Sequence, residues 1–96
     1  MECTDVDFEF SPSDTVIIPQ QGHERVNLVA RFRDAAGVQL PWAELEWEAR
    51  LPEPAAGVEV LGRSLVQVGV QAAPGAVRVA IVVANGVNRA KVLTLM

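Results

Sequence analysis

Apolar and polar residues alternate along this chain, and the alternation limits what it can fold into. The longest such stretch is 24–34, where most second positions are apolar and their neighbours are mostly polar. A period of two residues places the apolar side chains on one face of a β-strand. A strand with one apolar face predicts an antiparallel sheet that is buried on one side. The apolar set is Val26, Leu28, Ala30 and Phe32; the polar set is Arg25, Asn27, Arg31 and Arg33, with Val29 as the exception.

The same period recurs at intervals of roughly ten residues, and turn-forming residues separate the stretches. Residues 76–84 are apolar on both faces except at Arg78, which predicts a central strand. In 66–71 the predicted inward residues are Val66, Val68 and Val70. The pattern predicts an all-β fold, an antiparallel two-sheet β-sandwich of roughly seven to eight strands. The predicted strands are 5–10, 15–18, 24–34, 42–51, 58–61, 66–71, 76–84 and 87–95.

The segment 42–51 allows two interpretations. Its Ala, Glu, Leu and Arg residues are good helix formers. Its apolar residues Leu45, Trp47 and Ala49, however, follow a period of two, and a proline stands at each end of the segment. We therefore favour a strand here, with Trp47 pointing inward as the core tryptophan.

Local signals predict further details of the strands and turns. Pro12 is expected to interrupt the first strand, because proline cannot donate a hydrogen bond to a ladder. Asn85-Gly86 is the dipeptide that a type I′ hairpin turn prefers. In 87–95 the apolar residues change parity after Val92, and a β-bulge there would turn both sets inward. The two sets are Ala90 with Val92, and Leu93 with Leu95.

Length, charge and cysteine content exclude several classes of protein. The 96 residues fit a single domain, residues 1–96. A formal net charge of −4 without a basic patch argues against nucleic acid as a partner. Cys3 is the only cysteine, so no internal disulfide can form. The first residues do not form a signal peptide, and no stretch reaches the ~18 apolar residues of a membrane span. We interpret the chain as one domain of a longer protein.

Several landmarks follow one another in an order that resembles a known family. They are a proline-containing first strand, Gly22 before the next strand, Asp34 with Gly37 after it, the inward Trp47, the segment 58–62, the turn Pro74-Gly75 and a terminal hairpin. This order resembles the bacterial immunoglobulin-like domains that are repeated in intimin- and invasin-type adhesins and in other surface proteins. Such domains also occur in polysaccharide-active enzymes and in phage virion proteins. The resemblance implies an Ig-like β-sandwich and an extracellular or cell-surface location, and it implies no shared binding residues.

The residue pattern does not indicate catalysis, and we do not expect an enzyme. His23 is the only histidine and stands in a predicted turn, which favours a solvated residue over a catalytic or metal-binding one. None of the three serines has the context of a nucleophile elbow. One histidine and Cys3, without another soft ligand, do not make a zinc site. We therefore expect no catalytic residue, no cofactor and no bound metal.

Two rows of acidic side chains lie on predicted strand faces. A row on a regular strand places its carboxylates about 7 Å apart, too far to surround one calcium ion without help from loops. A solvated face is favoured over a calcium site at a domain junction. We expect the first row beside Arg31 and Arg33, and the second row in one sheet with Arg78, Arg89 and Lys91. The first row is Asp5, Asp7 and Glu9, and the second is Glu44, Glu46 and Glu48.

Trp42 is the one candidate ligand contact. It follows Pro41 at a strand entrance, where it either caps the end of the sandwich or lies exposed. An exposed tryptophan stacks on sugar rings, although packing is the favoured interpretation.

Three functions follow from these expectations. The first is a non-catalytic structural, spacer or adhesion module of a bacterial surface or secreted protein. Its partners would be neighbouring domains of the same chain or another protein. The second is an Ig-like domain of a phage virion, on the tail or capsid, which would place the chain in the virion. The third is a carbohydrate-binding accessory module with a glycan partner at Trp42. None of the three involves nucleic acid or insertion into a membrane.

Overall fold

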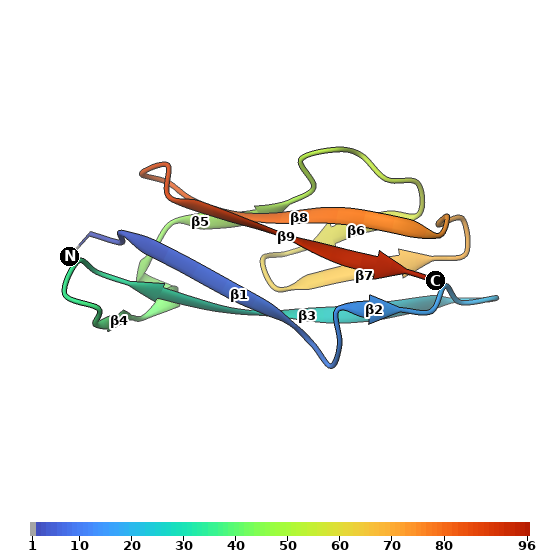
Figure 1. Ribbon diagram of the computed structural model, residues 1–96, viewed down its shortest axis with the longest axis horizontal. Coiled ribbons are helices and arrows are strands. Elements are labelled where there is room, and N and C mark those ends of the chain that lie inside the picture. The colour runs from blue at the N-terminus through green and yellow to red at the C-terminus, as the bar shows by residue number, and fades with distance from the viewer. Residues whose placement is uncertain (1) are drawn as a thin grey trace.

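Two β-sheets form the two layers of the computed structural model, which describes residues 2–96 (Figure 1). Sheet A contains, in spatial order, β1 (Asp5–Ser11), β3 (His23–Arg33), β7 (Leu65–Gly69) and β6 (Val58–Leu61), with β4 (Gln39–Leu40) beside β3. Sheet B contains, in spatial order, β2 (Thr15–Val16), β9 (Asn88–Leu95), β8 (Gly75–Val83) and β5 (Trp47–Arg50). Paired strands are antiparallel except β2 and β9, which are parallel. The all-β prediction is therefore confirmed.

The molecule is elongated, with principal extents of 45 × 23 × 19 Å. β1 begins near one end of the long axis and β9 ends near the other (Figure 1). Within residues 2–96 the strands number nine, against the seven or eight predicted, and two of them are only two residues long. Only β4 has no predicted counterpart, because β2 lies within the predicted strand 15–18.

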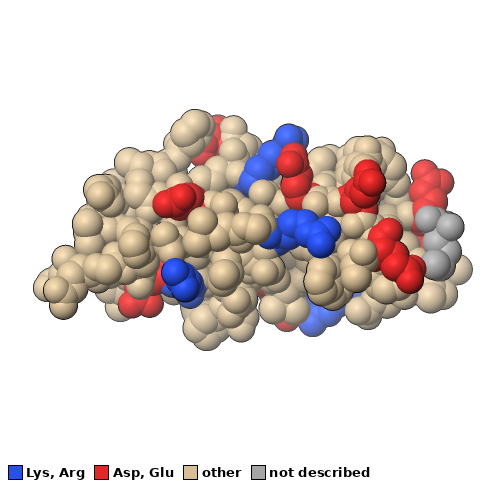
Figure 2. All heavy atoms as spheres, turned by 180° about the vertical axis from the view of Figure 1, so that it is seen from behind, with Lys and Arg blue, Asp and Glu red and all other residues tan. Residues whose placement is uncertain are grey.

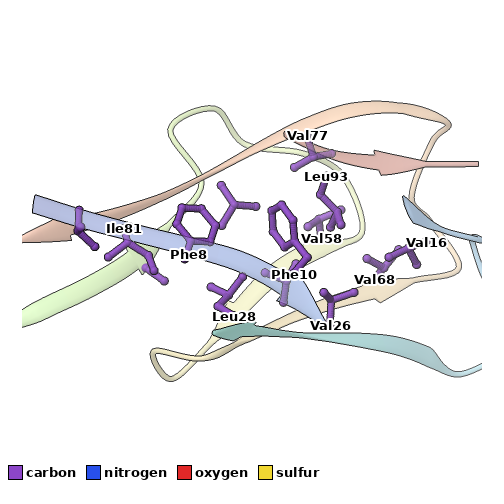
Figure 3. Packing of buried hydrophobic residues seen from close by; sticks show 14 of the residues in the cluster. Phe8, Phe10, Val16, Val26, Leu28, Val58, Val68, Val77, Ile81 and Leu93 are labelled. Atoms are coloured by element: carbon purple, nitrogen blue, oxygen red, sulfur yellow. The ribbon is translucent and has the colours of Figure 1, made fainter. Parts of the chain in front are cut away.

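The core lies between the two layers, where side chains from both sheets meet (Figure 3). The alternation in β3 is confirmed: Val26, Leu28 and Phe32 are buried, and Val29 is 40% exposed. β8 lies between β9 and β5, as its apolar composition predicted, and its inward residues are buried. Val70 was expected inward but is exposed, because β7 ends one residue earlier at Gly69.

The first strand is interrupted at Pro12, as expected, and the structure adds that its two parts pair in different sheets. β1 pairs with β3 from Asp5 to Ser11, and the chain then crosses to sheet B and forms β2 beside β9. Because the chain leaves sheet A at this point, the pairing of β3 with β1 ends at Asn27. Among residues 2–96, no strand therefore lies on that side of the beginning of β3.

The prediction of a strand throughout 42–51 is wrong for its first half. Trp42–Glu44 form a turn of 3₁₀ helix, and β5 begins only at Trp47. Pairing of β5 with β8 starts at Trp47 opposite Val83, and the chain turns immediately after Val83. Residues before Trp47 therefore have almost no partner strand to extend along. Trp47 is half-buried and packs on the core, with its ring centroid 5.1 Å from that of Phe32.

The β8–β9 hairpin also differs from its prediction. Gly86 has a φ of 96°, but Asn85 does not have a positive φ, so the turn is not type I′. The Gly86 N–H donates to the Val83 carbonyl and the Val83 N–H to the Val87 carbonyl, which closes a three-residue loop. The side-chain amide of Asn85 donates instead to the Cys3 carbonyl at 2.8 Å. This contact with the N-terminal segment could not be read from the dipeptide itself.

The expected bulge near Val92 is absent. The β8–β9 register continues without interruption from Gly75 opposite Leu95 to Val82 opposite Asn88. Leu93 and Leu95 are buried, whereas Ala90 is exposed and Val92 is 48% exposed. Arg89 and Lys91 therefore lie on the same face of β9 as the buried Leu93 and Leu95. Their side chains extend past the edge of the sheet and contact β1.

Candidate functional site

Trp42 lies on the 3₁₀ turn between β4 and β5, and 56% of its surface is exposed. The turn is held by backbone hydrogen bonds from Glu44 to Pro41 and from Leu45 to Trp42. The indole N–H of Trp47 also donates to the Trp42 carbonyl at 3.2 Å. Trp42 is therefore an exposed aromatic side chain on a backbone that is fixed from two sides.

Arg63 joins the two tryptophans. It lies in the turn between β6 and β7, and its guanidinium carbon is 5.5 Å from the Trp42 ring and 5.0 Å from the Trp47 ring. Cation–π contacts at exposed sites contribute about 0.5–1 kcal/mol each. Arg63 thus orients Trp42 relative to the sandwich. Sequence reasoning missed this residue, since Gly62-Arg63-Ser64 carries only the signal of a turn.

A hollow of about 430 Å³ opens beside the three side chains. Ala30 of β3 forms part of its wall. On this edge β3 pairs with β7 up to Asn27 and with β4 from Phe32, so Ala30 lies in the gap between these two partner strands. The N–H of Leu28 donates to the Ser64 carbonyl on the β7 side, so the backbone groups of Ala30 point the same way, toward the hollow. The hollow therefore offers aromatic and guanidinium surfaces together with a peptide donor and acceptor.

The first acidic row pairs partly as expected. Glu9 contacts Arg31 at 3.2 Å, and Asp5 contacts Arg33 at 3.9 Å, both across the β1–β3 pair. All four side chains are more than 40% exposed, so each contact contributes at most about 1 kcal/mol.

The second row lies in the expected sheet only in part: Glu48 of β5 shares sheet B with Arg78, Arg89 and Lys91, whereas Glu44 and Glu46 precede β5. It forms no ion pair with those basic residues within residues 2–96. Glu48 contacts Arg50 of its own strand at 3.3 Å, and Arg78 forms no ion pair within residues 2–96. Arg89 and Lys91 pair with the first row instead, across the boundary between the two sheets. The reason is that Arg89 and Lys91 lie on the face of β9 that is directed toward sheet A, where β1 lies. The contacts are Lys91 Nζ to Asp7 Oδ1 at 3.0 Å and Arg89 Nη2 to Asp5 Oδ1 at 3.5 Å.

These pairs form a clasp between β1 and β9, which we define as Asp5, Asp7, Arg89 and Lys91. Arg89 Nε also donates to the Val6 carbonyl at 3.1 Å, on the edge of β1 that faces away from β3. The hydrogen bond from Lys91 holds the pKa of Asp7 below its usual value; burial opposes this shift, and the Phe8 N–H adds to it. The clasp therefore fastens the first strand to the opposite sheet.

The other candidates for chemistry lie apart. His23 is the first residue of β3 and is exposed. Cys3 is 2% exposed and precedes Thr4, whose N–H donates to the carbonyl of Arg33 at the end of β3. At about 3.3 Å per residue, the length of β3 separates them by about 30 Å. Among residues 2–96, no group of three or more His, Cys, Asp or Glu side chains is arranged to hold a metal ion.

The side of the molecule opposite that seen in Figure 1 carries charges of both signs, with acidic side chains gathered toward one end (Figure 2). The architecture defines an all-β, sandwich-like domain with two sheets. No model of a protein family matches the chain, and no curated protein or solved structure matches it. Within residues 2–96, none of the helical segments is long and apolar enough to cross a membrane.

Proposed function

We propose that this chain is a non-catalytic immunoglobulin-like module that spaces or presents other domains in a bacterial surface or secreted protein. The observation that supports the proposal is the strand order. The seven longer strands, lettered A to G along the chain, are ordered A-B-E-D in one sheet and G-F-C in the other. The same strand order occurs in Ig constant-type sandwiches, which supports the proposal. Trp47 at the start of the third of these strands, packed on Phe32, agrees with the core tryptophan of that fold.

The shape of the molecule suits a spacer. The chain enters near one end of a 45 Å axis and leaves near the other, so successive domains would extend a chain lengthwise (Figure 1). The clasp ties β1 to β9, the two strands that would transmit load from neighbouring domains. The partners would be neighbouring domains or another protein.

The location of the protein in its source cells tests this proposal. Antibodies raised against the domain should label intact cells, and protease treatment of intact cells should remove the label. Recovery of the protein only in purified virions would support the alternative, an Ig-like domain of a phage tail or capsid. Recovery only in the cytosol would contradict both.

A carbohydrate-binding accessory module is a second candidate, favoured by one observation. Trp42 is 56% exposed beside a hollow into which the Ala30 backbone points. An indole face binds the apolar face of a sugar ring, and backbone groups bind its hydroxyls. Retention on a panel of polysaccharides measures this activity. Trp42→Ala should abolish retention, whereas Val38→Ala, at an equally exposed site outside the hollow, should leave it unchanged. Failure of the unaltered domain to bind across the panel would contradict this candidate.

A further inference from the structure

The first residues of β3 have a free edge. β1 pairs with β3 only from Arg33 to Asn27, because the chain crosses to sheet B after Ser11. On its other side, β3 pairs with β7 from His23 to Asn27. Within the described part of the chain, residues 23–26 of β3 therefore have a strand on one side only. The position that a longer β1 would have occupied beside them is vacant.

The backbone groups on this free edge belong to His23 and Arg25. Hydrogen-bonding groups alternate between the two sides of a strand, and the N–H of Leu28 donates to Ser64 on the β7 side. Even-numbered residues of β3 therefore face β7, and odd-numbered residues face the vacant position. No hydrogen bond within residues 2–96 joins the backbone N–H of His23 or Arg25 on that side.

A hollow of about 470 Å³ lies along this edge. The segment 12–20, which includes β2, forms one wall, and residues 24–26 of β3 form the other. The first wall is largely apolar and includes Ile17, which is 74% exposed, and Ile18. The free edge is thus flanked by apolar surface that remains accessible to solvent.

We propose that this edge, residues 23–26 of β3, binds an extended segment of another polypeptide as an added antiparallel strand. The segment would continue sheet A in line with β1 and exchange two pairs of hydrogen bonds with His23 and Arg25. Strand addition needs a row of free donors and acceptors with space beside it, and both occur here.

The side chains around the edge define the composition of the segment. Inward positions of the added strand would face Val16 and Val26, which favours small apolar side chains there. The outward position directly opposite Arg25 favours an acidic side chain, since opposite charges on facing residues attract. Arg25 uses its Nε to contact Gln67 at 3.0 Å, which leaves its terminal nitrogens for a carboxylate. The geometry therefore selects alternating apolar and acidic residues.

The peptide Val-Glu-Val-Ser-amide serves as the probe, because with its glutamate opposite Arg25 its first residue lies opposite Val26 and stops short of the Asn27–Ser11 pair. Amide hydrogen exchange of the whole domain is the measurement. Exchange proceeds from the free fraction, so the His23 and Arg25 amides should slow about tenfold when about nine-tenths of the sites are occupied. The amides of Glu24 and Val26 are bonded to β7 with or without the peptide, so a change from an unprotected to a protected amide is expected at His23 and Arg25 alone. Unchanged exchange at His23 and Arg25, or slower exchange along β5 or β6 instead, would overturn the proposal.

Matched variants separate strand addition from nonspecific binding. A peptide N-methylated at its glutamate cannot donate to the Arg25 carbonyl and should lose binding. Arg25→Glu should weaken binding of the glutamate peptide about fivefold and should favour a peptide with lysine in place of that glutamate. The affinity of Arg25→Gln for the glutamate peptide should lie between those of the unaltered domain and Arg25→Glu. Equal binding of the N-methylated peptide would refute strand addition. If the His23 and Arg25 amides exchange slowly in the peptide-free domain and lose this protection on dilution, the edge is occupied by a second copy of the domain. That result would overturn the proposal that it binds a segment of another polypeptide.

Discussion

Asp7 is the residue at which several interactions of the clasp meet. Its carboxylate lies 3.0 Å from Lys91 Nζ and 4.0 Å from Arg89 Nε, and it also accepts the Phe8 N–H at 2.9 Å. These contacts hold the Asp7 pKa below its usual value of 3.8. The folded state therefore binds the proton of this carboxyl less readily than the unfolded chain does.

Asp7→Asn should lower the free energy of unfolding by a few tenths of a kcal/mol at neutral pH, since the carboxylate is 41% exposed and screened by solvent. A lowered folded-state pKa stabilises the fold above the unfolded-state pKa, and that stabilisation is lost as the pH falls through the folded-state value. Denaturant titrations of both proteins should therefore differ at pH 7 and converge in strong acid. A difference that persists below both pKa values would show that the charge of Asp7 is not its cause.

Phe32 is the residue whose truncation should cost most. It is 0% exposed, pairs with β4 on one side and packs on the Trp47 ring. Phe32→Ala should lower the free energy of unfolding by about 3–5 kcal/mol, because the cavity adds to the lost burial. Val29→Ala is the control on the same strand and should cost less than about 1 kcal/mol at its exposed position. Equal losses in chemical denaturation would contradict the assigned faces of β3.

At the scale of elements, the clasp determines how firmly β1 is held. Arg89 contacts Asp5 and donates to the Val6 carbonyl, so one side chain reaches both a charge and the backbone of β1. Arg89→Gln should speed amide exchange in β1 more than in β8, because β8 is enclosed by β9 and β5. Equal acceleration in both strands would mean that Arg89 contributes to global stability and not to the hold on β1.

The β5–β6 loop and the β7–β8 turn touch at Gly57. Gly57 has a φ of 73°, and an added Cβ would lie against the Ala72 backbone nitrogen and 2.9 Å from its Cα. Gly57→Ala therefore combines an unfavourable φ with a clash against backbone, and should destabilise the fold by more than about 2 kcal/mol. Gly37→Ala is the matched control: its φ is 81° with open space around it, so only the cost of the φ, about 1 kcal/mol, is expected. Thermal unfolding of both variants measures the difference.

At the scale of the whole molecule, length is the property that bears on the proposed role. The radius of gyration is 14.0 Å, whereas a compact domain of this size has about 12–13 Å. Small-angle X-ray scattering of the dilute domain should return a value close to that of the elongated monomer. A clearly larger value that falls on dilution would indicate association, with β5, β6 or the free edge of β3 as the candidate surfaces.

Much of the fold follows from local pattern. The faces of β3 and β8, the bounds of β6 and the break at Pro12 were all predictable, because a period of two and the missing proline N–H act within a few residues. The predictions that were wrong share a different origin. β5 begins late because β8 ends opposite Trp47, and Asn85 contacts the Cys3 carbonyl far away in sequence. Local pattern contains no information on either partner.

The sequence by itself determined that this chain forms two sheets of short strands with its apolar residues between them. Trp42 could also be identified from sequence as the aromatic residue to examine. Only the tertiary structure decided that Arg63 lies beside Trp42 and that Arg89 and Lys91 reach β1. It also decided that the edge of β3 at 23–26 is free. The physical reason is that alternation specifies which face of a strand is buried, whereas pairing across the sheets specifies which side chains and backbone groups meet.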